Sequence, residues 1–294
     1  MTAKRIVLIS FLLAFCIIGY FAAVHLIKQK TIDEIDRTVS EIHYVEQLDF
    51  AGLHIGFSAP RLTMKEISLK IRGLEGKIRV KKFMVHDYEE KNNVVGNLNF
   101  EATGIQLPLE NLQLSGKADK KRKAAIDDPL FNLKCRYTYD PVSKVFHLKT
   151  FHTESESIGE LIFSATLSNM NLNSISLNSP ATLIASLTGV YLNSATLIYD
   201  DHSFLNELLK TGKKTANSTI SNITANAICR ISRIAGQESD PFVKGSLLAA
   251  RNFLRNPERI EVRAAPENPV LLGRLLFIRK PEGLIRTLRL RIME

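Results

Sequence analysis

The first thirty residues constrain the architecture of this chain more than any later segment. An almost unbroken apolar run from Ile6 to Ile27 is flanked on both sides by basic residues. A helix needs roughly 20 apolar residues to cross a bilayer, whereas the apolar centre of a cleaved signal peptide spans only about 7–15 residues. We therefore predict that residues 1–30 form a short cytoplasmic tip and a transmembrane signal anchor, followed by a water-exposed body.

The side of the membrane on which the body lies depends on the charges around this run. Lys4 and Arg5 precede it and Lys28 and Lys30 follow it, so the positive-inside rule is nearly balanced. A very short polar leader is the usual form of a signal anchor, which favours a cytoplasmic N-terminus and an external body. Cleavage near the end of the run remains an alternative.

Composition places the rest of the chain among folded globular proteins. The chain is 45% hydrophobic and 23% charged, and residues 31–294 suffice for one large domain or two ordinary ones. The net charge of +9 is concentrated around residues 117–123 and in the C-terminal 51 residues. Because Trp is absent and the arginines alternate with core-type residues, we expect no nucleic-acid partner.

Each basic cluster has two interpretations. A solvated face is the simpler one, and attraction to an anionic membrane surface is the functional one. The candidate contacts in the first cluster are Lys117, Lys120, Lys121, Arg122 and Lys123.

Residues 31–116 are expected to hold an amphipathic helix and a first β-meander. Apolar residues recur at helical spacing over 31–48, and then alternate with polar ones in short runs separated by turn residues. The expected strands are Leu53–Phe57, Leu62–Ile71, Lys77–Val85 and Val94–Ala102. Such alternation predicts antiparallel strands with one dry and one wet face.

A basic linker at 117–129 separates this region from a second meander at 130–200. The strands expected there are Leu130–Tyr139, Lys144–His152, Gly159–Leu167 and Ala181–Tyr199, the last with a break near Gly189. In residues 201–294 the period changes again, and we expect helices at Ser203–Thr211, Ser218–Ala235, Asp240–Phe253 and Pro269–Ile278, with strands at Arg259–Ala264 and Ile285–Ile292. The predicted fold class is α+β: a transmembrane helix, antiparallel meanders forming a curved sheet or groove, and a mixed α/β end.

Catalytic and metal-binding patterns are scarce. No Gly-rich phosphate loop, zinc motif or nucleophile elbow occurs, and the histidines are scattered singly. The densest polar group is Asp200–Ser203 at a strand-to-helix turn, where helix capping explains the residues as well as a hydrolase site does. We predict a protein that is not an enzyme and has no cofactor or metal. Cys135 and Cys229 could form one disulfide or remain two thiols.

Strands with one strongly apolar face must bury that face. They can pack on helices, or they can curl into a groove that holds a lipid chain. The candidate groove residues, which alternate along two of the predicted strands, are Leu53, Ile55, Phe57, Leu98 and Phe100.

The anchor followed by Gly52–Phe57 and Leu62–Leu69 resembles the start of AsmA-like bacterial envelope proteins. Segments Ala195–Asp201 with Phe204–Leu209, and Phe253–Ile260 with Ala265–Val270, are similar to uncharacterised proteobacterial periplasmic proteins. The resemblance implies a β-groove after the membrane helix, a single-pass inner-membrane location with a periplasmic body, and a role in lipid movement or envelope maintenance. Its implied partners are membrane lipids and envelope proteins, and the alternative role is structural assembly of an envelope complex through the anchor and exposed strand edges.

Overall fold

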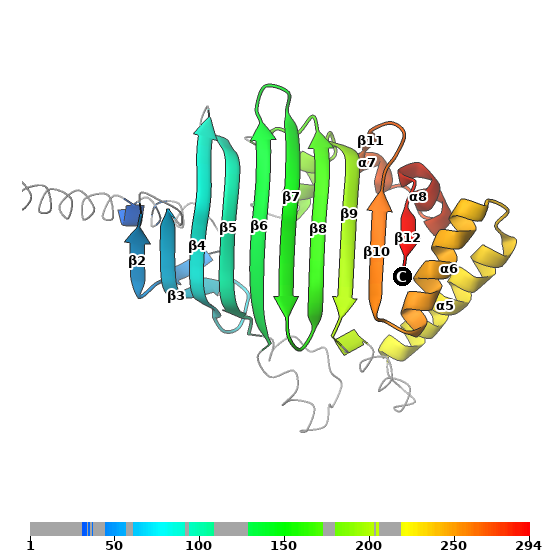
Figure 1. Ribbon diagram of the computed structural model, residues 1–294, viewed down its shortest axis with the longest axis horizontal. Helices are drawn as coiled ribbons and strands as arrows, with labels where there is room; N and C mark the ends of the chain where they lie inside the picture. The colour runs from blue at the N-terminus through cyan, green and yellow to red at the C-terminus, as the bar shows by residue number, and fades with distance from the viewer. Residues whose placement is uncertain are drawn as a thin grey trace, which may run out of the picture.

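The computed structural model describes residues 31–33, 35, 37, 45–56, 61–91, 94–108, 129–172, 180–202, 204–205 and 219–294. Within them the chain builds one open, curved antiparallel sheet of 12 strands in the order β1-β3-β4-β5-β6-β7-β8-β9-β10-β12, with β2 on β3 and β11 on β9 (Figure 1). Neighbours in the sheet are mostly neighbours in sequence, as expected for a meander. The strands are β1 Val45–Asp49, β2 Gly52–Ile55, β3 Leu62–Ile71, β4 Ile78–Lys91, β5 Val94–Gln106, β6 Leu130–Asp140, β7 Val145–Ser155, β8 Gly159–Ser168, β9 Tyr191–Asp201, β10 Arg259–Ala264, β11 Val270–Leu271 and β12 Arg291–Met293.

The sheet is continuous across the segment expected to be a linker. Strand β5 pairs directly with β6, from Asn97 opposite Thr138 to Gln106 opposite Leu130. The two meanders are therefore one sheet. Residues 109–128, which include most of the expected linker, lie outside the described residues.

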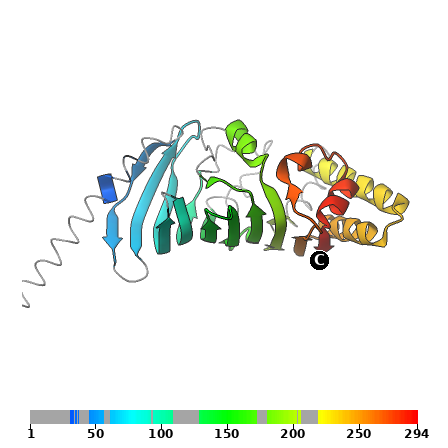
Figure 2. The ribbon, with the colours of Figure 1, turned by 90° about the horizontal axis from the view of Figure 1, so that it is seen from above.

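The helices are α3 Pro180–Leu187, α5 Thr219–Gln237, α6 Pro241–Arg255, α7 Leu272–Leu275 and α8 Pro281–Leu288. Figure 2 shows the sheet curving toward the side on which α3 lies, while α5 and α6 lie beyond β12 at the C-terminal end. The described residues between 31 and 37 are also helical. No helix in the described part of the chain is long and apolar enough to cross a membrane, and residues 1–30, where the anchor is predicted, lie outside that part.

Several sequence predictions are confirmed. Helices α5 and α6 occupy the two segments with the clearest helical stripes, and β10 has the expected bounds Arg259–Ala264. The start of α6 follows from local chemistry. Asp240 is the N-cap and accepts a hydrogen bond from the Phe242 amide at 2.9 Å, and Pro241 occupies the first turn, where it costs no helical hydrogen bond.

Other predictions are wrong, each because the spacing of the apolar residues is compatible with both a helix and a strand. The helix expected through residue 48 gives way to β1, which pairs with β3. Residues 181–187, expected to begin a strand, belong to α3. The first half of the expected strand Ile285–Ile292 belongs to α8, which ends where Arg289 adopts a left-handed conformation (φ 47°), and only β12 is extended. The helix expected over Pro269–Ile278 contains β11 and only four helical residues.

Three packed clusters are found among the described residues. The N-terminal cluster centres on Leu53, Met64 and Ile67, and Ile32 and Ile35 of the first helical segment pack against it. The C-terminal cluster is Ala235, Val243, Leu247 and Ile285, between α5, α6 and α8. The rim cluster is Leu192, Ala264 and Leu288, where α8 contacts the sheet.

Candidate functional site

The strand register places an apolar row across the whole sheet. Each cross-strand pair joins two side chains on the same face, so successive pairings trace one line from β2 to β12. Every member is a hydrocarbon side chain except one cysteine. The apolar row is Ile55, Leu62, Val85, Phe100, Cys135, Phe151, Phe163, Leu197, Val262 and Ile292.

Ala195 and Ala264, which lie two residues from Leu197 and Val262 and so share their face, pack with Leu288 of α8. Figure 2 shows α8 on the same side of the sheet as α3, which is the side toward which the sheet curves, so the row lies on the concave face. A second row beside it begins at Leu53 and runs through Met64, Phe83 and Ala102. Phe83 and Phe100 of the two rows are in ring contact with centroids 5.4 Å apart, and Tyr137 contacts Phe146 at 5.0 Å. The concave face is therefore lined by hydrocarbon and aromatic groups.

Irregularities in the strands contribute to this curvature. Register shifts interrupt the β4–β5, β5–β6, β6–β7, β7–β8 and β8–β9 pairings, and such bulges bend and twist a strand. At the β5–β6 bulge Gly104 has φ +64°, and its amide donates to Asn132 Oδ1 at 3.1 Å. A Cβ at Gly104 would lie 2.8 Å from Lys81 Cβ, so glycine is required there.

Burial is incomplete along the whole length of the row. All ten side chains are half-buried, whereas Val243 and Leu247 in the C-terminal cluster are 0% and 2% exposed. Phe100, Cys135, Phe151 and Phe163 belong to none of the three clusters formed by the described residues. Burial raises the pKa of the Cys135 thiol and of the Tyr137 phenol, which marks this face as poorly solvated.

The structure places four of the five predicted groove residues on this face. Ile55 and Phe100 belong to the apolar row, Leu53 begins the second row, and Leu98 is two residues before Phe100 on β5. Leu53, however, is 7% exposed within the N-terminal cluster and contributes to core. Phe57 lies outside the described residues, as do Lys117, Lys120, Lys121, Arg122 and Lys123, so their predicted roles stay predictions.

Sequence reasoning missed the row's central and C-terminal members. Cys135, Phe151, Phe163 and Leu197 lie in strands that were expected, but their alignment depends on bulges that alternation does not reveal. The recurrence of Phe in neighbouring expected strands is the sequence feature that could have indicated these residues.

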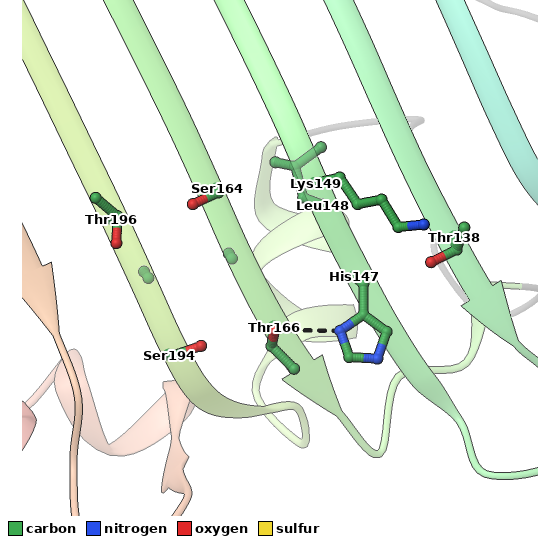
Figure 3. A pocket seen from close by; sticks show the side chains of 10 residues that line it. Thr138, His147, Leu148, Lys149, Ser164, Thr166, Ser194 and Thr196 are labelled. Carbon is green, nitrogen blue, oxygen red and sulfur yellow. Dashed lines mark hydrogen bonds between the residues drawn. The ribbon is translucent and has the colours of Figure 1, made fainter.

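The opposite face is polar and holds a shallow, open depression of about 520 Å³. Figure 3 shows its hydroxyl groups, His147 and Lys149 projecting from the sheet, with His147 Nδ1 lying 3.2 Å from Thr166 Oγ1. No carboxylate lines it, so this depression lacks an acid that could orient or activate His147. The lining residues are Thr138, His147, Leu148, Lys149, Ser164, Ala165, Thr166, Ser194, Ala195 and Thr196.

The polar turn at 200–203 has structural partners. Asp200 pairs with Arg259 of β10 at 3.1 Å, and Asp201 Oδ1 accepts from the Tyr199 hydroxyl at 2.8 Å and the Leu205 amide at 2.9 Å. His202 Nδ1 lies 3.3 Å from the Ser155 carbonyl oxygen. These groups point to different partners, which fits capping and strand anchoring better than a shared substrate. Ser203 lies outside the described residues.

Cys135 and Cys229 are both free thiols, the first half-buried on the concave face and the second exposed on α5. No group of three or more potential metal-ligating side chains occurs among the described residues.

Comparison with known proteins gives one family match and assigns no function to this face. The model of one family, described as an uncharacterized protein, matches residues 152–294. That match begins in β7 and includes the C-terminal half of the sheet and all the helices from α3 onward. A search of curated proteins finds no match.

Proposed function

We propose that this chain is a non-enzymatic, membrane-anchored protein of the bacterial envelope whose concave face binds the acyl chains of a lipid. The observation that carries the proposal is the apolar row, which is continuous over ten strands and half-buried throughout. A soluble protein normally buries such a surface fully, and a continuous apolar surface that stays partly accessible is typical of a binding site.

The dimensions of the row's centre suit an acyl chain. Neighbouring strands are about 4.8 Å apart, so the three intervals from Phe100 to Phe163 span about 14 Å. The hydrocarbon of one bilayer leaflet is about 15 Å thick, half of the roughly 30 Å core. One lipid tail could therefore lie across β5, β6, β7 and β8.

The proposed location follows from the sequence. The apolar run in residues 1–30 supports a single-pass inner-membrane anchor with a cytoplasmic N-terminus and a periplasmic body. The AsmA-like resemblance of Gly52–Leu69 supports lipid movement or envelope maintenance as the role. Membrane lipids are then the ligand, and no cofactor is required.

Photo-crosslinking in living cells tests this proposal with the full chain. A photoreactive phenylalanine at position 151 would lie on the apolar row, whereas the same group at position 150, opposite Arg136, would lie on the other face. We expect phospholipid adducts by mass spectrometry at position 151 and none at position 150. Equal labelling at the two positions, or no lipid adduct at 151, would overturn lipid binding.

The second candidate is a structural role in an envelope assembly, favoured by one edge of the sheet. Strand β2 pairs with β3, and its other edge has no strand partner in the described part of the chain. An open edge can accept a strand from another protein. Protein adducts in place of lipid adducts, obtained with a photoreactive group at His54, would favour this role.

A further inference from the structure

The loop between α7 and α8 carries two of the most exposed large apolar side chains in the described residues. Leu276 is 63% exposed and Phe277 is 83% exposed, although Leu275 beside them packs against the rim cluster. Phe277 is the most exposed aromatic side chain among the described residues. We call Leu276 and Phe277 the apolar tip.

Exposed basic residues flank the apolar tip on both sides. Arg274 precedes it, and Arg279 and Lys280 follow it. Some other arginines of the C-terminal region pair with carboxylates, as Arg286 does with Glu238 at 2.6 Å and Arg289 with Glu267. Arg274, Arg279 and Lys280 form no ion pair with any described residue, so these three cations are available to an external anion.

The apolar tip lies at one end of the strands, together with other exposed apolar groups. The pairings of Ser168 with Tyr191 and of Leu271 with Tyr191 bring the end of β8, the start of β9 and α7 to the same rim. The β6–β7 turn with Val142, 87% exposed, lies at this end too (Figure 1). Tyr191 itself is 38% exposed.

We propose that the apolar tip docks this rim on an anionic lipid bilayer. Leu276 and Phe277 enter the boundary between headgroups and acyl chains, and Arg274, Arg279 and Lys280 contact lipid phosphates. An apolar projection with basic residues around it satisfies the two requirements of interfacial binding, which are buried apolar area and attraction to anionic lipids. Long basic side chains can extend along an apolar surface while their charges stay at headgroup level. This inference goes beyond acyl-chain binding by the concave face and does not depend on it.

The chain contains no tryptophan, so a Phe277→Trp variant of the full chain carries a single fluorescent reporter at the tip. Ile223→Trp provides the matched control, because Ile223 is also 62% exposed but lies on α5. Each variant is reconstituted in phosphatidylglycerol or phosphatidylcholine vesicles, with and without brominated acyl chains, which quench tryptophan on contact.

We expect brominated phosphatidylglycerol to reduce the fluorescence of the Phe277→Trp variant by about twofold or more, and to leave that of the control variant almost unchanged. Adding Arg274→Gln, Arg279→Gln and Lys280→Gln to the Phe277→Trp background should return quenching to the control level. Quenching no greater than at position 223 would overturn the proposal, and equal quenching in phosphatidylcholine would overturn the role of the cations. A concentration-dependent blue shift without vesicles would instead assign the tip to a second copy of the chain.

Discussion

The helices at the C-terminal end and the centre of the sheet bury their apolar side chains to different extents. At the C-terminal end α6 and α8 supply a dry cluster in which Val243 is 0%, Leu247 2% and Ile285 3% exposed. At the centre Phe151 and Phe163 stay half-buried and belong to no packed cluster of the described residues. Alternation along each strand therefore determines which face is apolar, while the helices that pack on one another at the C-terminal end supply the most deeply buried core.

The C-terminal helices are held by specific contacts as well as by apolar burial. Ser246 of α6 donates its hydroxyl to the Leu290 carbonyl at 2.8 Å, which ties the helix to the segment before β12. Phe253 of the same helix meets Tyr199 of β9 edge to face, with ring centroids 6.3 Å apart. These contacts fix α6 against the sheet, and within the described residues no ring contact of this kind joins a helix to β5–β8.

The largest expected effect is on stability at the packed end. Leu247→Ala should lower the free energy of unfolding by about 2–5 kcal/mol, because it empties a site that the surrounding helices cannot fill. Leu133→Ala on β6, next to Ala102 of the second row, removes the same atoms from a half-buried side chain and should cost about 1 kcal/mol. Urea denaturation of both variants measures the difference.

Equal losses in the free energy of unfolding for Leu247→Ala and Leu133→Ala would contradict a difference in packing between the two regions. That result would mean that the centre of the sheet is packed as tightly as the C-terminal cluster, and the concave face would then be an interior with no room for a lipid.

The second prediction concerns ligand occupancy at the centre. Phe151→Asp places a carboxylate in the apolar row and should reduce bound lipid by about tenfold, because an ionised group disfavours contact with a hydrocarbon chain. Thr150→Asp adds the same charge on the opposite face and should leave lipid content unchanged. Lipid extraction from the purified full chain, with quantitative mass spectrometry, gives both values, and similar losses in the two variants would exclude a face-specific site.

The third prediction separates hydrogen bonding from ring packing at the boundary between the two regions. The Tyr199 hydroxyl donates to Asp201 at 2.8 Å, and both burial and this contact raise its pKa. Tyr199→Phe keeps the ring against Phe253 and should destabilise the chain by about 1 kcal/mol through loss of the hydrogen bond. A loss as large as that of Leu247→Ala in thermal or urea unfolding would show that the hydroxyl does more than hold the end of β9.

Sequence periodicity predicted the face of each strand but not the alignment between strands. Ile55 and Phe100 were expected on one apolar face, and they do share the apolar row. Their connection to Phe163 depends on register shifts that move each strand relative to the next, and a single chain's alternation contains no information on these shifts.

The C-terminal errors have a different origin. The pattern Leu288-Arg-Leu-Arg-Ile292 alternates like a strand although it spans the end of α8 and the start of β12. Likewise, Leu276 and Phe277 suit the buried stripe of a helix in the sequence, and only the structure places them in solvent. Apolar character identifies candidates for burial, whereas tertiary packing decides which of them remain exposed.

The smallest expected effect is on the rate at which Cys135, at the centre of the sheet, is alkylated. Burial raises the pKa of Cys135 above that of an ordinary thiol, so near neutral pH its reactive thiolate should be scarce and alkylation should be slower than at the exposed Cys229. The rate at Cys135 should keep rising as the pH passes the ordinary thiol pKa, because the thiolate forms only there. A lipid on the apolar row would slow alkylation of the Cys135 sulfur further by shielding it, and would leave the rate at Cys229 unchanged. Peptide mapping after timed alkylation, with and without delipidation, reports both sites in one sample. If delipidation accelerates neither site, the lipid lies elsewhere, and the concave face remains an open apolar surface that still needs a partner.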